Sequence, residues 1–300
     1  MAATGPAELA PQELRVLVAV AEARGFSAAA ARLGLTQSAV SHSVRGSEAK
    51  LGAVLFERGR SGATPTPAGE RAVALGRRIL RMYEALGSEV RAAGSAGAGR
   101  DALRGVLRIA AFRSAALHLL PPALERLAAR YPGIRPEVRV VRELGAGTAG
   151  EVAAGRADLA IATLDADGSG LPPGLLSGVL VEEAYALVHP PGHADPRSLP
   201  LLDWDENCGS YTRAWWRAQD WIPCATVKAD DDGMVLTMVG RGLGMAIMPE
   251  LSLREADGSV DITDLGPSRP VRQVGYVTAP ESAATVAVRA LIRELRSDTA

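Results

Sequence analysis

With 300 residues and 47% hydrophobic side chains but few aromatic ones, the chain can form two or three compact units of an alanine-rich globular protein. No apolar run reaches the length of a membrane span, and the first residues, MAATGPAELAPQ, lack the pattern of a signal peptide. We therefore expect a cytoplasmic protein. Cys208 and Cys224 give no disulfide framework and no metal spacing with the four histidines. We predict ordinary thiols, no metal and no cofactor, with redox sensing by the two cysteines as the alternative.

The net charge of −1 hides an asymmetry along the chain. Residues 1–100 hold 13 Lys and Arg against 8 Asp and Glu, a balance of +5. The whole-chain totals are 33 and 34, so residues 101–300 hold the other 20 and 26, a balance of −6. The basic N-terminal part is expected to contact a polyanion.

Three short helices are predicted in the first 51 residues. Pro11 to Ala23 carries apolar residues at helical spacing and should supply one side of a three-helix core. Ser27 is the predicted N-cap of a second helix, which Gly34 ends. Thr36 or Ser38 can cap a third helix after a turn of three or four residues, so the segment has the helix-turn-helix pattern.

The third helix is predicted to read DNA. Val40, Val44 and Leu51 fall on one face, which should point inward. The opposite face carries the polar residues Gln37, Ser38, Ser41, His42 and Arg45. Gln pairs well with adenine and Arg with guanine, while Ser and His are short enough to let the helix enter the major groove.

A short strand, Val54 to Phe56, and the turn-rich segment ERGRSGATPTP should form a wing. Arg58 and Arg60 lie at its glycine-flanked tip, where they are expected to contact phosphate or the minor groove. The alternative is a solvated loop. Thr66 is the predicted N-cap of the next helix, with Pro67 at its first position, and we include Thr66 among the DNA-binding residues.

The helix that follows has a heptad seam with charged flanks. The seam consists of Ala68, Ala72, Leu75, Ile79, Met82, Leu86 and Val90. A single helix of about 25 residues does not bury such a stripe alone, so Ala72, Leu75, Ile79, Met82 and Leu86 are the predicted dimerisation contacts. Packing against its own domain is the alternative. The small-residue run at 92–99 should end the helix as a hinge.

From Gly105 the pattern alternates between strands and helices, which predicts an α/β domain with a largely parallel sheet. Strands are expected at 106–111, 137–141, 158–162, 176–180, 184–189, 225–228, 245–248 and 271–277. Helices are expected at 115–131, 148–154, 232–239 and 282–295. The order resembles the two-lobed periplasmic-binding-protein fold, with lobe I at about 104–182 and 270–300 and lobe II at about 183–269.

In such a fold a small ligand lies in the cleft at the carboxyl ends of the strands. The residues that this rule places there are Arg113, Ser114, Thr163, Asn207, Tyr211, Asp230 and Asp231. Asn207 and Tyr211 belong to an expected loop from 207 to 212. The alternatives are that Ser114 and Asp231 only cap helices and that Arg113 pairs with an acid. The mixed charges fit an amphoteric or multi-hydroxyl molecule as well as a carboxylate.

The run VAEARGFSAAAARLGLTQSAVSHSVRGSEAKLGAVLFERGRSGATPTPAGERAV resembles the winged helix-turn-helix of LysR-type transcriptional regulators, and GRADLAIA is similar to part of their sensor domain. Ser47 stands where this family usually has Leu, and a buried Leu would contribute about 2 kcal/mol. The Ser47 hydroxyl is expected to bond to the carbonyl one turn earlier. His42 stands where many relatives have Arg, which changes the expected base preference.

The resemblance implies a cytoplasmic homotetramer, a dimer of dimers, that binds double-stranded DNA and responds to a small effector held between the lobes. RNA polymerase is a further expected partner, and no membrane is expected. The expected units are a DNA-binding domain at 1–66, a linker helix and hinge at 67–99, and an effector-binding domain at 100–300. An architectural DNA-binding protein without effector is the alternative, and an enzyme acting in the cleft is the least favoured one, because no nucleophile, base and orienting group occur together.

Overall fold

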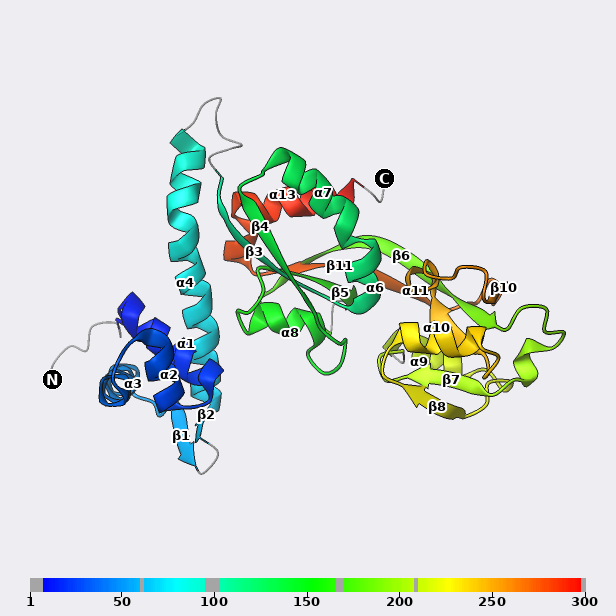
Figure 1. The fold of residues 1–300 in the computed structure, drawn as a ribbon, viewed down its shortest axis with the longest axis horizontal. Helices are drawn as coiled ribbons and strands as arrows, with labels where there is room; N and C mark the ends of the chain where they lie inside the picture. The colour runs from blue at the N-terminus through cyan, green and yellow to red at the C-terminus, as the bar shows by residue number, and fades with distance from the viewer. Residues whose placement is uncertain (1–7, 60–61, 95–102, 166–169, 208–209, 298–300) are drawn as a thin grey trace.

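The computed structural model describes residues 8–59, 62–94, 103–165, 170–207 and 210–297. A small helical unit and a long helix, α4, lie at one end of the molecule, and two α/β lobes follow (Figure 1). We use lobe I for residues 103–182 and 270–297 and lobe II for residues 183–269. None of the described helices is long and apolar enough to cross a membrane.

The N-terminal unit is a winged helix-turn-helix. Its elements are α1 (Pro11–Ala23), α2 (Phe26–Leu33), α3 (Gln37–Leu51), β1 (Phe56–Gly59) and β2 (Gly62–Pro65). Apolar residues of all three helices form one core, which includes Leu17, Ala30 and Val44 and is closed by Leu55 before the wing. The prediction of three short helices is therefore confirmed.

Two local predictions about this unit are wrong. The N-cap of α2 is Gly25, and Ser27 lies inside the helix. The wing strand begins at Phe56, two residues later than expected, and the backbone N–H of Leu55 just before it donates to the Glu48 carboxylate at 2.8 Å. Thr66 Oγ1 donates to the Val54 carbonyl at 2.7 Å and strengthens the same connection.

Helix α4 (Pro67–Gly94) is slightly longer than predicted and begins at the predicted residue. Thr66 caps it, since its Oγ1 accepts the Gly69 N–H at 3.0 Å. One side of α4 packs on α1, where Gly76 lies against Leu14 and Val18. Residues 95–99 of the hinge expected at 92–99 lie outside the described residues.

Lobe I is a twisted sheet between two helical layers. The strand order in the complete sheet is β10-β6-β11-β5-β3-β4, and β9 pairs with β6 off this path; β9 (Ala246–Pro249) and β10 (Asp261–Asp264) belong to lobe II. Strands β3 (Gly105–Ala111), β4 (Ile134–Val140) and β5 (Leu159–Leu164) are parallel, and β11 (Val271–Thr278) runs antiparallel between β5 and β6 (Leu176–His189). Helices α7 (Leu120–Arg130) and α13 (Val286–Arg296) cover one face, and α8 (Gly147–Ala153) covers the other (Figure 1).

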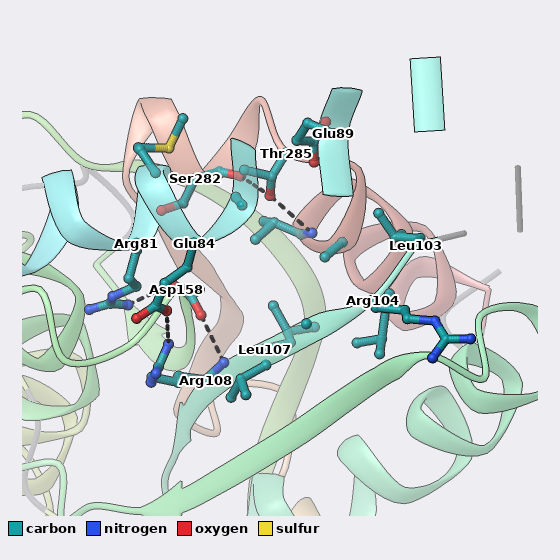
Figure 2. Close-up of a pocket in the computed structure, with 17 residues that line it drawn as sticks. Arg81, Glu84, Glu89, Leu103, Arg104, Leu107, Arg108, Asp158, Ser282 and Thr285 are labelled. Carbon is teal, nitrogen blue, oxygen red and sulfur yellow. Dashed lines mark hydrogen bonds and ion pairs between the residues drawn. The ribbon is translucent and has the colours of Figure 1, made fainter. Parts of the chain in front are cut away.

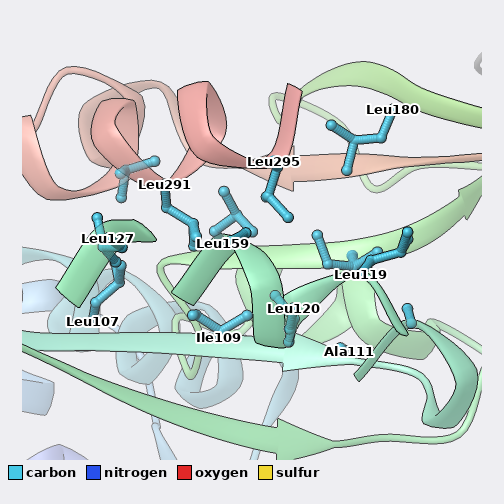
Figure 3. Close-up of a cluster of buried hydrophobic side chains, with 14 of the residues drawn as sticks. Leu107, Ile109, Ala111, Leu119, Leu120, Leu127, Leu159, Leu180, Leu291 and Leu295 are labelled. Atoms are coloured by element: carbon cyan, nitrogen blue, oxygen red, sulfur yellow. The ribbon is translucent and has the colours of Figure 1, made fainter. Parts of the chain in front are cut away.

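The main core of lobe I lies between the sheet and the α7/α13 layer. Leu107 and Ile109 of β3 contact the leucines of α7, and Leu291 closes the core from α13 (Figure 3). These side chains are nearly inaccessible to solvent. This rigid layer fixes the carboxyl end of β3, where α6 (Arg113–His118) begins.

Lobe II is built on the second half of β6. Its remaining elements are η1 (Pro196–Ser198), β7 (Leu201–Trp204), α9 (Ser210–Arg217), β8 (Ala225–Ala229), α10 (Asp232–Gly240), β9 (Ala246–Pro249), α11 (Glu250–Leu253) and β10 (Asp261–Asp264). Strands β7 and β8 are parallel, and β9 and β10 flank β6. Val188, Trp204, Val235 and Met248 belong to its core.

Several predicted elements differ from the observed ones. The helix expected at 115–131 is two helices, α6 and α7, because consecutive prolines open α7 after a break at Leu119. The strands expected at 176–180 and 184–189 are one continuous strand, β6, that passes between the lobes. The final helix is divided into α12 (Pro280–Ala283) and α13. The loop expected at 207–212 contains the start of α9, and β7 and β10 were not predicted.

Candidate nucleic-acid interface and effector cleft

The exposed face of α3 carries four of the predicted DNA-binding side chains. Gln37, Ser38, His42 and Arg45 are all exposed. Thr36 caps the helix, as predicted, by accepting the Ala39 N–H at 3.2 Å. The polar side chains therefore lie at the beginning and along one side of α3, which is the arrangement that direct reading of base edges requires.

Two serines of α3 face inward. Ser41 was predicted on the groove face, but it is 6% exposed, and its carbonyl accepts Arg45 Nε at 3.3 Å. Ser47 is fully buried, and its hydroxyl donates to the Ser43 carbonyl at 3.0 Å, as predicted. The C-terminal Leu51 is 37% exposed, so the predicted inward stripe ends at Ser47.

The wing and its neighbours show how the positive charge is distributed. Arg58 lies on β1, although its side chain is not among the described ones, and Arg60 lies outside the described residues. Lys50 is paired with Glu13 at 2.7 Å. The hydrogen bond from Lys50 lowers the pKa of Glu13. Lys50 thus has an acidic partner, whereas Arg45 lies on the exposed face of α3.

Most of the predicted seam of α4 is exposed in the described part of the chain. Leu75 is 39% exposed, Ile79 44%, Met82 40% and Leu86 58%. Together with Tyr83 they line a shallow groove along the helix. Ala72 lies at the end of this stripe nearest the winged unit and packs partly against its core. A continuous apolar stripe on a long helix is typical of a helix that pairs with another.

The opposite flank of α4 is fixed to lobe I by arginines. Arg77 donates to the Ala154 carbonyl at 3.2 Å, and Arg78 bonds the Glu281 carboxylate. Arg81 Nη1 lies 2.6 Å from Asp158 Oδ1, and both side chains are largely buried. Figure 2 shows this joint, with Arg81 of α4 directed at Asp158 beside the first residues of β3. One flank of α4 therefore packs against lobe I, and the apolar stripe remains exposed.

Arg113 is the predicted effector residue that the structure places most clearly between the lobes. It begins α6 in lobe I, and its Nη1 lies 3.0 Å from Asp232 Oδ1 in lobe II. Its Nη2 lies 2.7 Å from Glu255 Oε2. Desolvation would lower the pKa of Arg113, but the hydrogen bond to Glu255 and the charges of both carboxylates outweigh it and raise the pKa. Arg113 thus pairs with acids, which was the alternative expectation for it.

Of the other predicted cleft residues, some lie at or near the ends of strands and one caps a helix. Ser114 is buried beside Arg113, and Thr163 lies on β5 in register with Val274. Asp231 caps α10 by accepting the Met234 N–H at 2.9 Å, which was its alternative role, and Asp230 is exposed.

Asn207 is buried in lobe II. Its Nδ2 donates to Asp203 at 2.8 Å and to the Ile247 carbonyl at 3.1 Å, while its Oδ1 has no partner among the described residues. The side chain of Tyr211 and all of Cys208 lie outside the described set, and Cys224 is exposed. Asn207 therefore organises the end of β7.

A second bridge between the lobes was missed from the sequence. Arg142, after β4, lies 2.9 Å from Glu206, and the Glu143 N–H donates to the same carboxylate at 3.2 Å. Desolvation raises the pKa of Glu143, although hydrogen bonds from Thr148 oppose the shift. Asp232, Glu255, Arg142 and Glu206 belong to segments far apart in the chain, so sequence periodicity gives no signal for their proximity.

The strands that connect the lobes carry a buried ion pair. Arg272 of β11 donates to Glu183 of β6 at 2.7 Å, and its guanidinium lies 5.1 Å from the Phe112 ring centroid. The second Glu183 oxygen accepts the Leu251 N–H at 2.6 Å. This pair fixes the strand crossing next to Arg113. An exposed recognition helix joined to a two-lobed α/β unit with polar groups at the lobe junction defines a DNA-binding regulator with a ligand-binding domain.

Comparisons with known proteins identify the family. Residues 100–300 match the LysR substrate binding domain, and residues 11–70 match the bacterial regulatory helix-turn-helix protein, lysR family. The probable HTH-type transcriptional regulator LrrA of Synechococcus elongatus is 32% identical over 252 residues, which cover 80% of this chain and 81% of LrrA. The probable hydrogen peroxide-inducible genes activator of Mycobacterium avium is 29% identical over 279 residues, 88% of this chain and 86% of that protein.

The fold has solved counterparts. The crystal structure of ArgP from Mycobacterium tuberculosis matches with a TM-score of 0.74 and 21% identity, covering 98% of each chain. The chain belongs to the LysR family of transcriptional regulators. It is a DNA-binding regulator whose promoter binding is modulated by a small effector of its C-terminal domain.

Proposed function

We propose that this regulator reads its promoter through the exposed face of α3, with Gln37, Ser38, His42 and Arg45 directed to base edges. The exposure of these four side chains on a capped helix is the observation that carries the proposal. Thr36 and Thr66 cap their helices, and we assign their hydroxyls and that of Ser27, in the first turn of α2, to phosphate contacts. Arg58 and Arg60 of the wing supply charge.

Paired reading heads require paired chains. The seam of α4, with Leu75, Ile79, Met82 and Leu86 exposed, supports a dimer through this helix, and Ala72 extends the contact. We assign a homotetramer, a dimer of such dimers, as the state bound to DNA. A regulator of this kind works in the cytoplasm and acts on RNA polymerase. The functional units of this proposal are residues 1–66, 67–99 and 100–300.

The effector is assigned to the junction between the lobes. The support is the position of Arg113 and Ser114 after β3 and of Thr163 on β5, together with Asp230 and Asp231 ahead of α10 on the facing lobe. Asn207 and Tyr211 lie near the start of α9 on the same lobe. An effector acts only if it binds two arrangements of the lobes with unequal affinity.

The test is fluorescence anisotropy with the upstream DNA of the protein's own gene and a scrambled duplex, across a salt series. We expect at least about a thousandfold discrimination and a steep salt slope for both duplexes. Arg45→Ala should weaken specific binding by about 1–3 kcal/mol and leave nonspecific binding nearly unchanged. Arg135→Ala, an exposed arginine of β4 in lobe I, is the matched control and should behave like the wild type.

Equal and salt-labile binding of both duplexes would favour an architectural protein instead. Turnover of a substrate by the purified protein would favour the enzyme alternative. A peroxide response is the candidate that the name of the Mycobacterium avium relative suggests, and the exposed thiol of Cys224 is the feature that could serve it. We assign ordinary thiols, so peroxide should leave DNA binding unchanged. A peroxide effect that Cys224→Ser or Cys208→Ser abolishes would overturn that assignment.

A further inference from the structure

The guanidinium of Arg113 lies in a group of carboxylates that belongs entirely to lobe II. Asp232 contacts Nη1 and Glu255 contacts Nη2, at 3.0 and 2.7 Å. Asp231 Oδ1 lies 3.9 Å from Nε. We call these three acids and the intervening Gly233 the carboxylate cradle. Separate acids thus face three different nitrogens of one planar cation.

The cradle is a formed site whose shape does not depend on Arg113 alone. Asp232 is 7% exposed, and its second oxygen accepts the Ser252 hydroxyl at 2.6 Å. The Gly233 N–H donates to Asp232 Oδ1 at 3.0 Å. A Cβ at Gly233 would lie 2.3–2.8 Å from guanidinium atoms of Arg113, so glycine provides the space that the cation fills. Lobe II therefore presents fixed carboxylates and a guanidinium-sized gap.

One cradle oxygen remains without a hydrogen bond. Glu255 Oε1 is buried and has no such partner among the described residues. His118 Nε2 of lobe I lies 3.5 Å away and is likewise unbonded within the described chain. Glu255 thus retains an acceptor that the fork of Arg113 does not fill. A ligand with an additional N–H group would find this acceptor available.

Arg113 is tethered to lobe I and makes the shortest contacts between α6 and the cradle, with His118 of the same helix near Glu255. Its side chain is 30% exposed, so solvent and a small solute reach it without unfolding of either lobe. A tethered group competes with a free ligand at an effective concentration of the order of millimolar. A free guanidinium compound of sufficient affinity can therefore replace it, and the link between α6 and α10 is then broken.

We infer that the carboxylate cradle is the recognition site for a guanidinium-bearing effector, which binds lobe II by displacing Arg113 and so removes the Arg113 contact between the lobes. This inference rests on the proposed effector response at the lobe junction. The planar fork of a guanidinium matches several carboxylates at once, whereas an ammonium is a point charge and engages fewer of them. A simple carboxylate would meet three acids and is disfavoured at this position.

The probe is methylguanidinium chloride, titrated calorimetrically into the full-length protein against sodium chloride of equal ionic strength. Arg113→Ala empties the cradle and should raise the affinity for methylguanidinium by about tenfold or more, because the tethered competitor is lost. Asp232→Asn in the Arg113→Ala background should abolish this gain. Methylammonium should bind Arg113→Ala more weakly than methylguanidinium does. The control Arg135→Ala, a surface arginine of lobe I, should bind like the wild type.

Equal affinities of the wild type and Arg113→Ala, or a gain that persists with Asp232→Asn, would overturn the inference. If Arg113→Ala does not fold, Arg113→Lys is the second variant, because it keeps a cation. Its affinity for methylguanidinium should lie between that of the wild type and the value expected for Arg113→Ala. An affinity equal to that of the wild type would contradict the inference. The same preparations are assayed for promoter binding by anisotropy. If the wild type binds its promoter specifically but Arg113→Ala does not bind methylguanidinium, the inference about the cradle is wrong and the proposed function stands. If the wild type does not discriminate between the two duplexes, the proposed function itself is wrong.

Discussion

The contact between Arg81 of α4 and Asp158 of lobe I provides a strict test of how the linker helix is held. Their side chains are 14% and 12% exposed, and the N–O distance is 2.6 Å. Arg81→Ala leaves the Asp158 carboxylate uncompensated, and removing one partner of a buried pair typically costs about 3–5 kcal/mol. Asp158 Oδ2 still accepts the Arg108 N–H at 2.8 Å, so we expect the lower end, about 3 kcal/mol.

This loss is measured by thermal unfolding of lobe I, with hydrogen exchange of the β3 and β5 amides as the probe. For a unit of about 100 residues a loss of 3 kcal/mol corresponds to a midpoint lower by about 12–24 °C. Asp158→Asn in the Arg81→Ala background removes the uncompensated charge and should recover part of the stability, and the double-mutant cycle isolates the pair.

A loss below about 1 kcal/mol, which is usual for an exposed pair, would refute the reasoning. It would mean that Asp158 becomes hydrated when Arg81 is removed, and hence that α4 leaves lobe I readily. The experiment therefore separates a fixed joint between linker helix and sensor lobe from a loose one.

Three further predictions concern association, helix stability and pH. Ile79→Asp should convert dimers to monomers in sedimentation experiments, because it places a charge in the α4 seam. The control Ile79→Val should remain associated. If the Asp variant is still a dimer, the seam is not the dimer interface. Ser47→Ala should stabilise the N-terminal unit by about 0.5 kcal/mol in urea unfolding, because Ala favours helix and the Ser43 carbonyl keeps its backbone partner; a clear loss would show that the hydroxyl bond dominates. The hydrogen bond from Arg78 lowers the pKa of Glu281, so its stabilising effect is present above the ordinary value of 4.5 and is lost as pH falls through the lower folded value. Acid should therefore reduce the melting temperature of the wild type more than that of Glu281→Gln, and parallel curves would contradict this.

Local signals in the sequence predicted most of the N-terminal unit. Caps, glycine stops and the spacing of Val40 and Val44 determine short helices from neighbouring residues, and Ser47 was correctly predicted to face inward. Ser41 was misplaced because it lies at the border between the two faces of α3, where spacing alone does not decide burial. Its neighbours in the tertiary structure decide it.

The lobe junction could be predicted only in outline. The rule that ligands bind at the carboxyl ends of strands selected Arg113, and the structure places it at the junction. Its partners Asp232 and Glu255 are 119 and 142 residues away in the chain, so no local pattern connects them. The short strand β7 was missed for a related reason, since four residues flanked by prolines and acids show no clear period.

The two ends of β3 connect the findings at the cleft and at the linker helix. Its last residue, Ala111, leads directly to α6 and Arg113, while the N–H of Arg108 near its start bonds Asp158, which also holds Arg81 of α4. Strand β5 runs parallel to β3 and is paired with it from Leu159 to Ile161. A packed strand moves as a rigid element. Release of Arg113 from lobe II and a change in the position of α4 would therefore both act on β3 and the sheet that contains it. An effector that changes the lobe arrangement therefore acts on the unit to which the DNA-binding helices are attached, and no long chain of intermediate contacts is required.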